Sequence, residues 1–178
     1  MNQNRLGVQL VDPTTRLEAS HETFVSEFRA LGEQLVTWIV DEPYERFSEY
    51  VAMLEAASKG IGIPPDFVPH STFWLVDAKN EIVAISNLRH GLNDFLVGYG
   101  GHIGYGVRPS ARQRGYATEV LGQTLKKAKA RGIDKVRITC SKDNAASAKT
   151  ILRNGGELDD EKFLPEHGEI VSRYWVKF

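Results

Sequence analysis

The segment from Val107 to Thr118 constrains the fold more than any other part of this sequence. It reads Val-Arg-Pro-Ser-Ala-Arg-Gln-Arg-Gly-Tyr-Ala-Thr, and a central strand must end at Pro109 because proline has no amide donor. Beyond it, small and apolar residues recur on one helix face: Ala117, Val120, Leu121, Thr124, Leu125 and Ala128. The segment therefore predicts a strand, a short basic turn and an amphipathic helix that Gly132 ends.

Such a junction is able to hold an anion. The first amides of a helix have no intrahelical acceptor, and the helix dipole places about half a positive charge at that end. Gly115 would let the backbone approach a ligand closely, and Arg112 and Arg114 would add charge. From these residues alone, an ordinary turn with solvated arginines explains the segment equally well.

The rest of the chain alternates strands and helices without repeats. Strand-like runs lie at 6–11, 71–76, 81–88, 102–107 and 136–140, with one or two more expected near the C-terminus. Apolar periodicity predicts further helices within 17–31, from 47 to near Gly60, and over 144–154. A length of 178 residues fits one core, so we expect a single α/β domain over 1–178, with a mixed sheet flanked by helices.

Composition excludes several classes of function. The 22 lysines and arginines balance 23 acidic residues, so there is no global field to draw the chain onto nucleic acid or an anionic membrane. No stretch is long and apolar enough to span a bilayer, and no signal segment opens the chain. Cys140 is the single cysteine, which excludes an intrachain disulfide and favours a packing role. We expect a cytoplasmic protein.

The motif Arg112-x-x-Gly115-x-Ala117 resembles the (Gln/Arg)-x-x-Gly-x-(Gly/Ala) signature of the general N-acetyltransferases, the GNAT family. It is placed as in that family, after a strand that ends in Val-x-Pro and at the opening of a helix, and the order of elements agrees over most of the chain. The resemblance implies the GNAT fold, a mixed but mostly antiparallel sheet with about four helices. It also implies an acetyl-CoA-dependent N-acetyltransferase.

The resemblance further implies how acetyl-CoA is held. Backbone amides would bind the pyrophosphate in the segment that Arg112 opens, namely Gln113, Arg114, Gly115, Tyr116, Ala117 and Thr118. The backbone of Tyr105, Gly106 and Val107 would pair with the pantetheine arm. The nearby Gly100, Gly101, Gly104 and Gly106 suit a ligand lying against the backbone, or a tightly twisted strand. Asn144 and Ser147 match the family's Asn-x-x-Ser helix near the cofactor arm, although Asn144 is equally suited to cap that helix.

Direct acetyl transfer to an amine needs a proton acceptor and a donor to the thioester oxygen, but no enzyme nucleophile and no metal. His102 is the first candidate base, because relatives often place a Glu on this strand and imidazole titrates near neutral pH. A hydrogen-bonded structural histidine is the alternative. Where many relatives have a Tyr as the acid for the leaving thiolate, this chain has Ile151. Tyr105, Tyr116, Tyr174 or water would have to replace it.

The acceptor is an amine that the sequence does not specify. Weaker candidates for holding it are Glu27, Glu33, His90 and Asp94. Its pocket walls could include Trp38, Trp74 and Trp175, although such residues are usually core. A domain of the same fold that binds acyl-CoA as a sensor, without transfer, is the second functional hypothesis. Exposed strand edges would permit a homodimer.

Overall fold

The computed structural model describes residues 6–35, 40 and 42–178. The first half of the chain builds an antiparallel sheet in which β1 (Gln9–Val11), β2 (His70–Val76), β3 (Ile82–Arg89) and β4 (Ile103–Val107) lie side by side in that order. The turn between β2 and β3 closes because the Asp77 carboxylate accepts the amides of Lys79 and Glu81.

The second half builds a smaller sheet. β5 (Lys135–Ser141), β6 (Glu157–Leu164) and β7 (Glu169–Lys177) form antiparallel pairs in the order β5-β7-β6. The two sheets meet where β4 and β5 begin: His102 N donates to Arg137 O at 2.7 Å, and Arg137 N donates to His102 Nδ1 at 2.9 Å. Beyond this point β4 and β5 belong to separate ladders, so the sheet is split between them.

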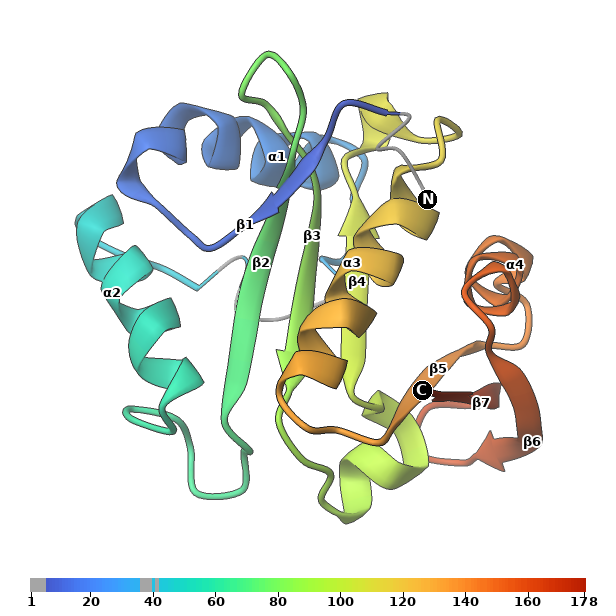
Figure 1. Cartoon of the computed structure of the whole chain (residues 1–178). Coiled ribbons are helices and arrows are strands. Elements are labelled where there is room, and N and C mark those ends of the chain that lie inside the picture. The colour runs from blue at the N-terminus through green and yellow to red at the C-terminus, as the bar shows by residue number, and fades with distance from the viewer. Residues whose placement is uncertain (1–5, 36–39, 41) are drawn as a thin grey trace.

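Helices cover both sides (Figure 1), because successive side chains of a strand point to opposite faces. On one face, α1 (Glu18–Ala30) and α2 (Phe47–Ser58) bury Phe24, Tyr50 and Leu54 against a cluster that includes Trp74 and Ile85. On the other, α3 (Tyr116–Ala130) buries its predicted apolar stripe against a cluster that includes Leu75, Ala84 and Leu88. In Figure 1, α4 (Ala145–Arg153) lies to the right of α3, above β6 and β7.

The predicted mixed α/β class with mostly antiparallel sheets and about four main helices is confirmed. Two local features were not predicted. A short helix, Thr15–Leu17, precedes α1 without a side-chain capping bond from Thr14, and Leu96–Gly100 forms a π-helical turn that the glycine-rich sequence did not indicate. Within the described ranges, no helix is long and apolar enough to cross a membrane.

Candidate active site

The turn before α3 leaves the first amides of that helix open. Gly115 occupies the N-cap position with φ 88°, in the left-handed region that favours glycine, and it provides no side chain to cap the helix. The first bond of the helix runs from Glu119 N to Gly115 O at 3.1 Å. The amides of Tyr116, Ala117 and Thr118 precede that bond, so the N-terminus of α3 has donors for an anion.

Helix α1 and the residues just after it hold this turn in place. The Glu27 carboxylate accepts Arg108 Nε at 2.6 Å, and both the amide and the hydroxyl of Ser110 at 2.9 Å. Burial raises the pKa of Glu27, but the hydrogen bonds from Ser110 and Arg108 outweigh it and leave the pKa below its usual value. Glu27 therefore anchors the start of the loop.

Arg112, the first residue of the motif, is engaged in the same way. Its guanidinium forms a bidentate pair with Glu33, with Nη1 to Oε1 at 2.8 Å, and stands 5.5 Å from the centre of the Phe28 ring. The hydrogen bond from Arg112 also lowers the pKa of Glu33. Glu27 and Glu33, two of the three acids that the sequence offered for the acceptor, thus bind this loop. The exposed Arg114 carries a charge on the same turn.

Four residues that the sequence analysis singled out come together beside the split. Tyr105 on β4 shares a hydrogen bond of 2.9 Å with Ser147 Oγ on α4, and Ser147 N donates to the capping carbonyl of Asn144 at 2.9 Å. Burial raises the pKa of Tyr105 to about 12, so its hydroxyl stays protonated at neutral pH. Cys140 on β5 belongs to this group, and burial raises its pKa although Ser147 opposes the shift.

His102 lies elsewhere. It is three positions from Tyr105 along the strand, so the two side chains point to opposite faces. Its Nδ1 already accepts the Arg137 amide, and burial together with the charge of Arg89 lowers its pKa to about 4. A neutral imidazole has one lone pair. To take a proton from an amine, His102 would have to give up its bond to Arg137.

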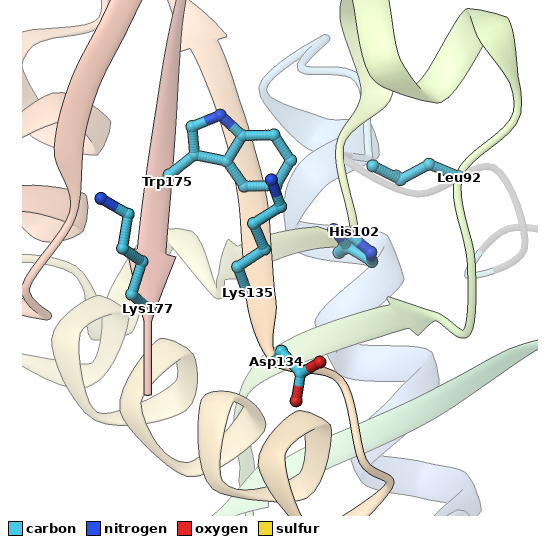
Figure 2. Close-up of a pocket in the computed structure, with 6 residues that line it drawn as sticks. All are labelled: Leu92, His102, Asp134, Lys135, Trp175 and Lys177. Atoms are coloured by element: carbon cyan, nitrogen blue, oxygen red, sulfur yellow. The ribbon is translucent and has the colours of Figure 1, made fainter.

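Figure 2 shows the surroundings of His102, an open depression of about 500 Å³. Trp175 and Lys177 project from β7 and Lys135 from β5, while His102 lies deeper, below Leu92. Lys135 Nζ stands 4.5 Å from the centre of the Trp175 ring. This depression is separate from the Tyr105 and Ser147 pair.

The other sequence candidates occupy less informative positions. Ile151 is 0% exposed within the core, so α4 offers no proton donor there. Tyr174 is buried and Tyr116 packs partly against the same core. Trp74 is core, and Trp38 lies outside the described residues. His90 Nε2 is 2.9 Å from Ser71 Oγ, and Asp94 is exposed.

A sheet split between two strands, with an open helix N-terminus next to the split, is the architecture of an acyl-CoA-dependent acetyltransferase. The acetyltransferase (GNAT) domain model matches residues 15–157, and the chain belongs to this family. A search of the curated proteins by sequence gives no match.

Solved structures agree on the fold. The ribosomal-protein-S5-alanine acetyltransferase of Vibrio fischeri superimposes with a TM-score of 0.69 at 13% identity, over 96% of this chain and 93% of the other. A dodecameric spermidine N-acetyltransferase of Vibrio cholerae gives 0.62 at 13%, over 96% and 94%. A ribosomal L7/L12 α-N-protein acetyltransferase gives 0.68 at 18%, over 97% and 94%; it was solved with coenzyme A in a disulfide with one of its cysteines.

Proposed function

We propose that this chain transfers an acetyl group from acetyl-CoA directly to an amine. The observation that carries the proposal is the pair formed by Tyr105 and Ser147, which lies beside the split while the open amides of α3 lie at the motif of the family. The pair offers a proton donor for the leaving thiolate, and the open amides offer an anion site for the pyrophosphate of coenzyme A.

The cofactor would be held largely by backbone. The amides from Gln113 to Thr118 would bind the pyrophosphate, and the backbone of Tyr105, Gly106 and Val107 would pair with the pantetheine arm. Arg114 would add its charge, whereas Arg112 contributes through its backbone because Glu33 holds its guanidinium. Asn144 and Ser147 would lie near the arm.

In the transfer, the amine nitrogen forms a bond to the thioester carbon and the carbon–sulfur bond breaks. The backbone amides of β4 can stabilise the oxygen as it gains charge. Tyr105 donates its proton to the leaving sulfur, a role that suits a hydroxyl held protonated, and Ser147 positions it. The amine proton leaves to a base. Cys140 stays a thiol in this scheme and forms no bond with the acetyl group.

His102 remains the candidate base from the sequence, and water is the alternative. His102→Gln tests it, because the Gln oxygen can still accept the Arg137 amide. If His102 is the base, kcat/KM falls at least tenfold and the acid limb of its pH profile disappears, since the limb reports the base of the free enzyme. An unchanged acid limb of the pH profile would mean that water, and not His102, accepts the amine proton.

The acceptor is proposed to be a small amine or a peptide. The structural neighbours include enzymes named for ribosomal proteins and for spermidine, so the fold itself accommodates both kinds of acceptor. A homodimer and a cytoplasmic location stay predictions from the sequence.

The first experiment is a thiol-release assay with acetyl-CoA across polyamines, amino acids, aminoglycosides and peptides, with calorimetric binding of acetyl-CoA alongside. Turnover of any amine would establish the transferase. Binding without turnover would favour the sensor hypothesis, which the apolar Ile151 at the usual acid position motivates. Absence of binding would overturn both.

A further inference from the structure

Three side chains that can carry positive charge form one row across three neighbouring strands. His70 on β2 is in register with Arg89 on β3, and Arg89 N donates to His102 O at 2.8 Å next to β4. Directly opposed residues point to the same face, with Cβ atoms about 5 Å apart. The row therefore brings a guanidinium between two imidazoles.

The row lies on the face that α1 and α2 cover. Asn87 Nδ2 donates to His70 Nδ1 at 2.9 Å and to Thr72 Oγ1 at 3.1 Å, so these residues share a face. Trp74 and Ile85, at the next alternate positions, pack in the cluster with α1 and α2. Tyr105, in contrast, points to the α3 face, where it meets Ser147.

Within the described residues, no acid neutralises the charge of Arg89. Its guanidinium donates from Nη1 to the carbonyl of Gly100 at 3.1 Å, and no Asp or Glu of that part of the chain forms an ion pair with it. Burial lowers its pKa to about 10, which still leaves it charged at neutral pH. A neutral amide could satisfy the Gly100 carbonyl. A desolvated cation without an opposite charge is unfavourable unless an anion joins it.

His70 and His102 do not supply that anion, and they do not add a second charge either. Burial, and then the charge of Arg89, lowers the pKa of each to about 4, so both rings are neutral at physiological pH. The row thus contains one cation between two neutral rings, and neither ring repels an anion.

The same face of the sheet extends along β4, whose backbone is the proposed site of acetyl transfer. Beyond His102, the residues of β4 on this face are Gly104 and Gly106, which are only partly buried and carry no side chains. Two residues of a strand span about 6.7 Å, so Gly104 and Gly106 lie roughly 7 and 13 Å along β4 from His102, the residue opposite Arg89. An acceptor approaching their backbone from the α1 and α2 face could reach both the thioester and Arg89.

We propose that Arg89 binds a carboxylate of the acceptor, and that the preferred substrate is an amine whose carboxylate lies several bonds from the reactive nitrogen. This inference rests on the proposed function. The same charge disfavours a polyamine, because a second ammonium would face the guanidinium. Arg89 is a specificity residue here and takes no part in the chemistry.

A matched series of acceptors tests the proposal: hexylamine, hexamethylenediamine and ε-aminocaproate. They share a six-carbon chain and differ in their far end, which lies roughly 7 Å from the amine in the extended form. We expect the wild-type protein to favour ε-aminocaproate over hexylamine in kcat/KM by about tenfold or more, and to disfavour the diamine. A preference for the diamine would overturn the proposal.

Arg89→Gln removes the charge and keeps a polar side chain on the same face of β3. It should lower kcat/KM for ε-aminocaproate by roughly 10- to 100-fold, through KM, while hexylamine changes less than about twofold. Arg89→Lys should retain part of the preference, and it replaces Arg89→Gln if that variant does not fold. Lys135→Gln is the control, since Lys135 is a cation of the neighbouring depression. Equal losses for all acceptors would show a structural role and overturn the proposal.

The two proposals can fail separately. Acetylation of hexylamine without any Arg89-dependent preference would sink the specificity proposal alone. If acetyl-CoA binds but no amine turns over, the proposed function fails. The proposed carboxylate site at Arg89 is then tested by calorimetric binding of ε-aminocaproate to the protein loaded with coenzyme A. Binding that Arg89→Gln weakens would support the site, and no binding would overturn it.

Discussion

At the scale of single residues, Tyr105 carries the clearest prediction. Its hydroxyl is held protonated by burial, is hydrogen-bonded to Ser147, and lies beside the split. Tyr105→Phe removes the proton and little else, so kcat should fall by about 100-fold while KM for acetyl-CoA changes less than about twofold. Steady-state kinetics with both substrates gives the two values.

Two further variants serve as controls for the effect of Tyr105→Phe on kcat. Ser147→Ala leaves the hydroxyl of Tyr105 in place and should give a smaller loss in kcat. Tyr174→Phe alters another tyrosine whose pKa burial raises, and it should leave kcat unchanged. The opposite pattern, with Tyr174 essential and Tyr105 dispensable, would make Tyr174 the acid instead of Tyr105.

The buried histidines predict how stability depends on pH. Burial, with the charge of Arg89, lowers the pKa of both His70 and His102 to about 4, whereas an unfolded histidine titrates near 6.5. Between these values the unfolded chain binds more protons, so stability is present above about pH 6.5 and is lost as the pH falls toward 4. Each unit of separation corresponds to about 1.4 kcal/mol.

Urea unfolding at about pH 7.5 and about pH 5 measures this loss as a lower midpoint. His102→Gln should reduce the dependence, because Gln does not titrate, and leave the part that His70 and His90 contribute, since burial lowers the pKa of each of these to about 4 as well. Glu27 and Glu33 have lowered pKa values, so the stability that their carboxylates contribute is lost only near pH 4.5 and lower. Their protonation therefore does not explain a loss of stability between the two pH values. A midpoint that stays constant between the two pH values would contradict the low pKa values.

Sequence reading found most of the residues at the candidate site but not their contacts. The motif around Gly115 is local, so its role at a helix start can be inferred from neighbouring letters. The bond between Tyr105 and Ser147 spans 42 positions, and that between Arg108 and Glu27 spans 81. No spacing rule relates such distant residues, and for this reason the bonds of Glu27 and Glu33 to the loop could not be predicted from the sequence.

At the scale of elements, the two ends of α3 provide a matched test. Gly115 and Gly132 flank the helix with φ of 88° and 84°, and an added Cβ meets one side chain at 3.6 Å at the first and open space at the second. Substitution by Glu therefore strains both backbones alike. Only Gly115→Glu places a carboxylate at the open amides, where it would repel and replace a phosphate.

We expect Gly115→Glu to weaken acetyl-CoA binding at least tenfold in calorimetry, and Gly132→Glu to leave the affinity within about twofold. Both should lose roughly 1 kcal/mol of stability from the strained residue. Similar affinities for the two variants would remove the N-terminus of α3 from the binding site.

Element boundaries were predictable where periodicity was regular. The stripe from Ala117 to Ala128 lies in α3, and the runs 71–76 and 81–88 lie within a residue or so of β2 and β3. The π-helical turn Leu96–Gly100 was missed because its glycines disfavour helix by propensity. Tertiary bonds from Arg89 and Thr139 to the carbonyls of Gly100 and Tyr99 hold it instead.

At the scale of the whole molecule, the β6 edge bears on assembly. β6 is the outer strand of its sheet and is exposed along most of its length. Five charged residues lie along it: Glu157, Asp159, Asp160, Glu161 and Lys162. Charges on an edge strand oppose pairing with another chain. The homodimer expected from exposed edges would therefore have to form through another surface.

The split between the sheets also predicts how the molecule responds to its cofactor. One backbone bond and one bond from a backbone amide to the His102 ring join the sheets at His102 and Arg137. A ligand between β4 and β5 would therefore add contacts to both halves and bind only the folded state. At a hundredfold excess over Kd, binding to the native state alone stabilises by about 2.7 kcal/mol. For a chain of this length that raises Tm by roughly 5 to 10 °C.

Thermal unfolding with acetyl-CoA tests this prediction. The wild type and Gly132→Glu should show the full shift in Tm, and Gly115→Glu should show only a small part of it. A shift that survives in Gly115→Glu would mean that the cofactor binds away from α3, and the site would then have to be sought elsewhere on the fold.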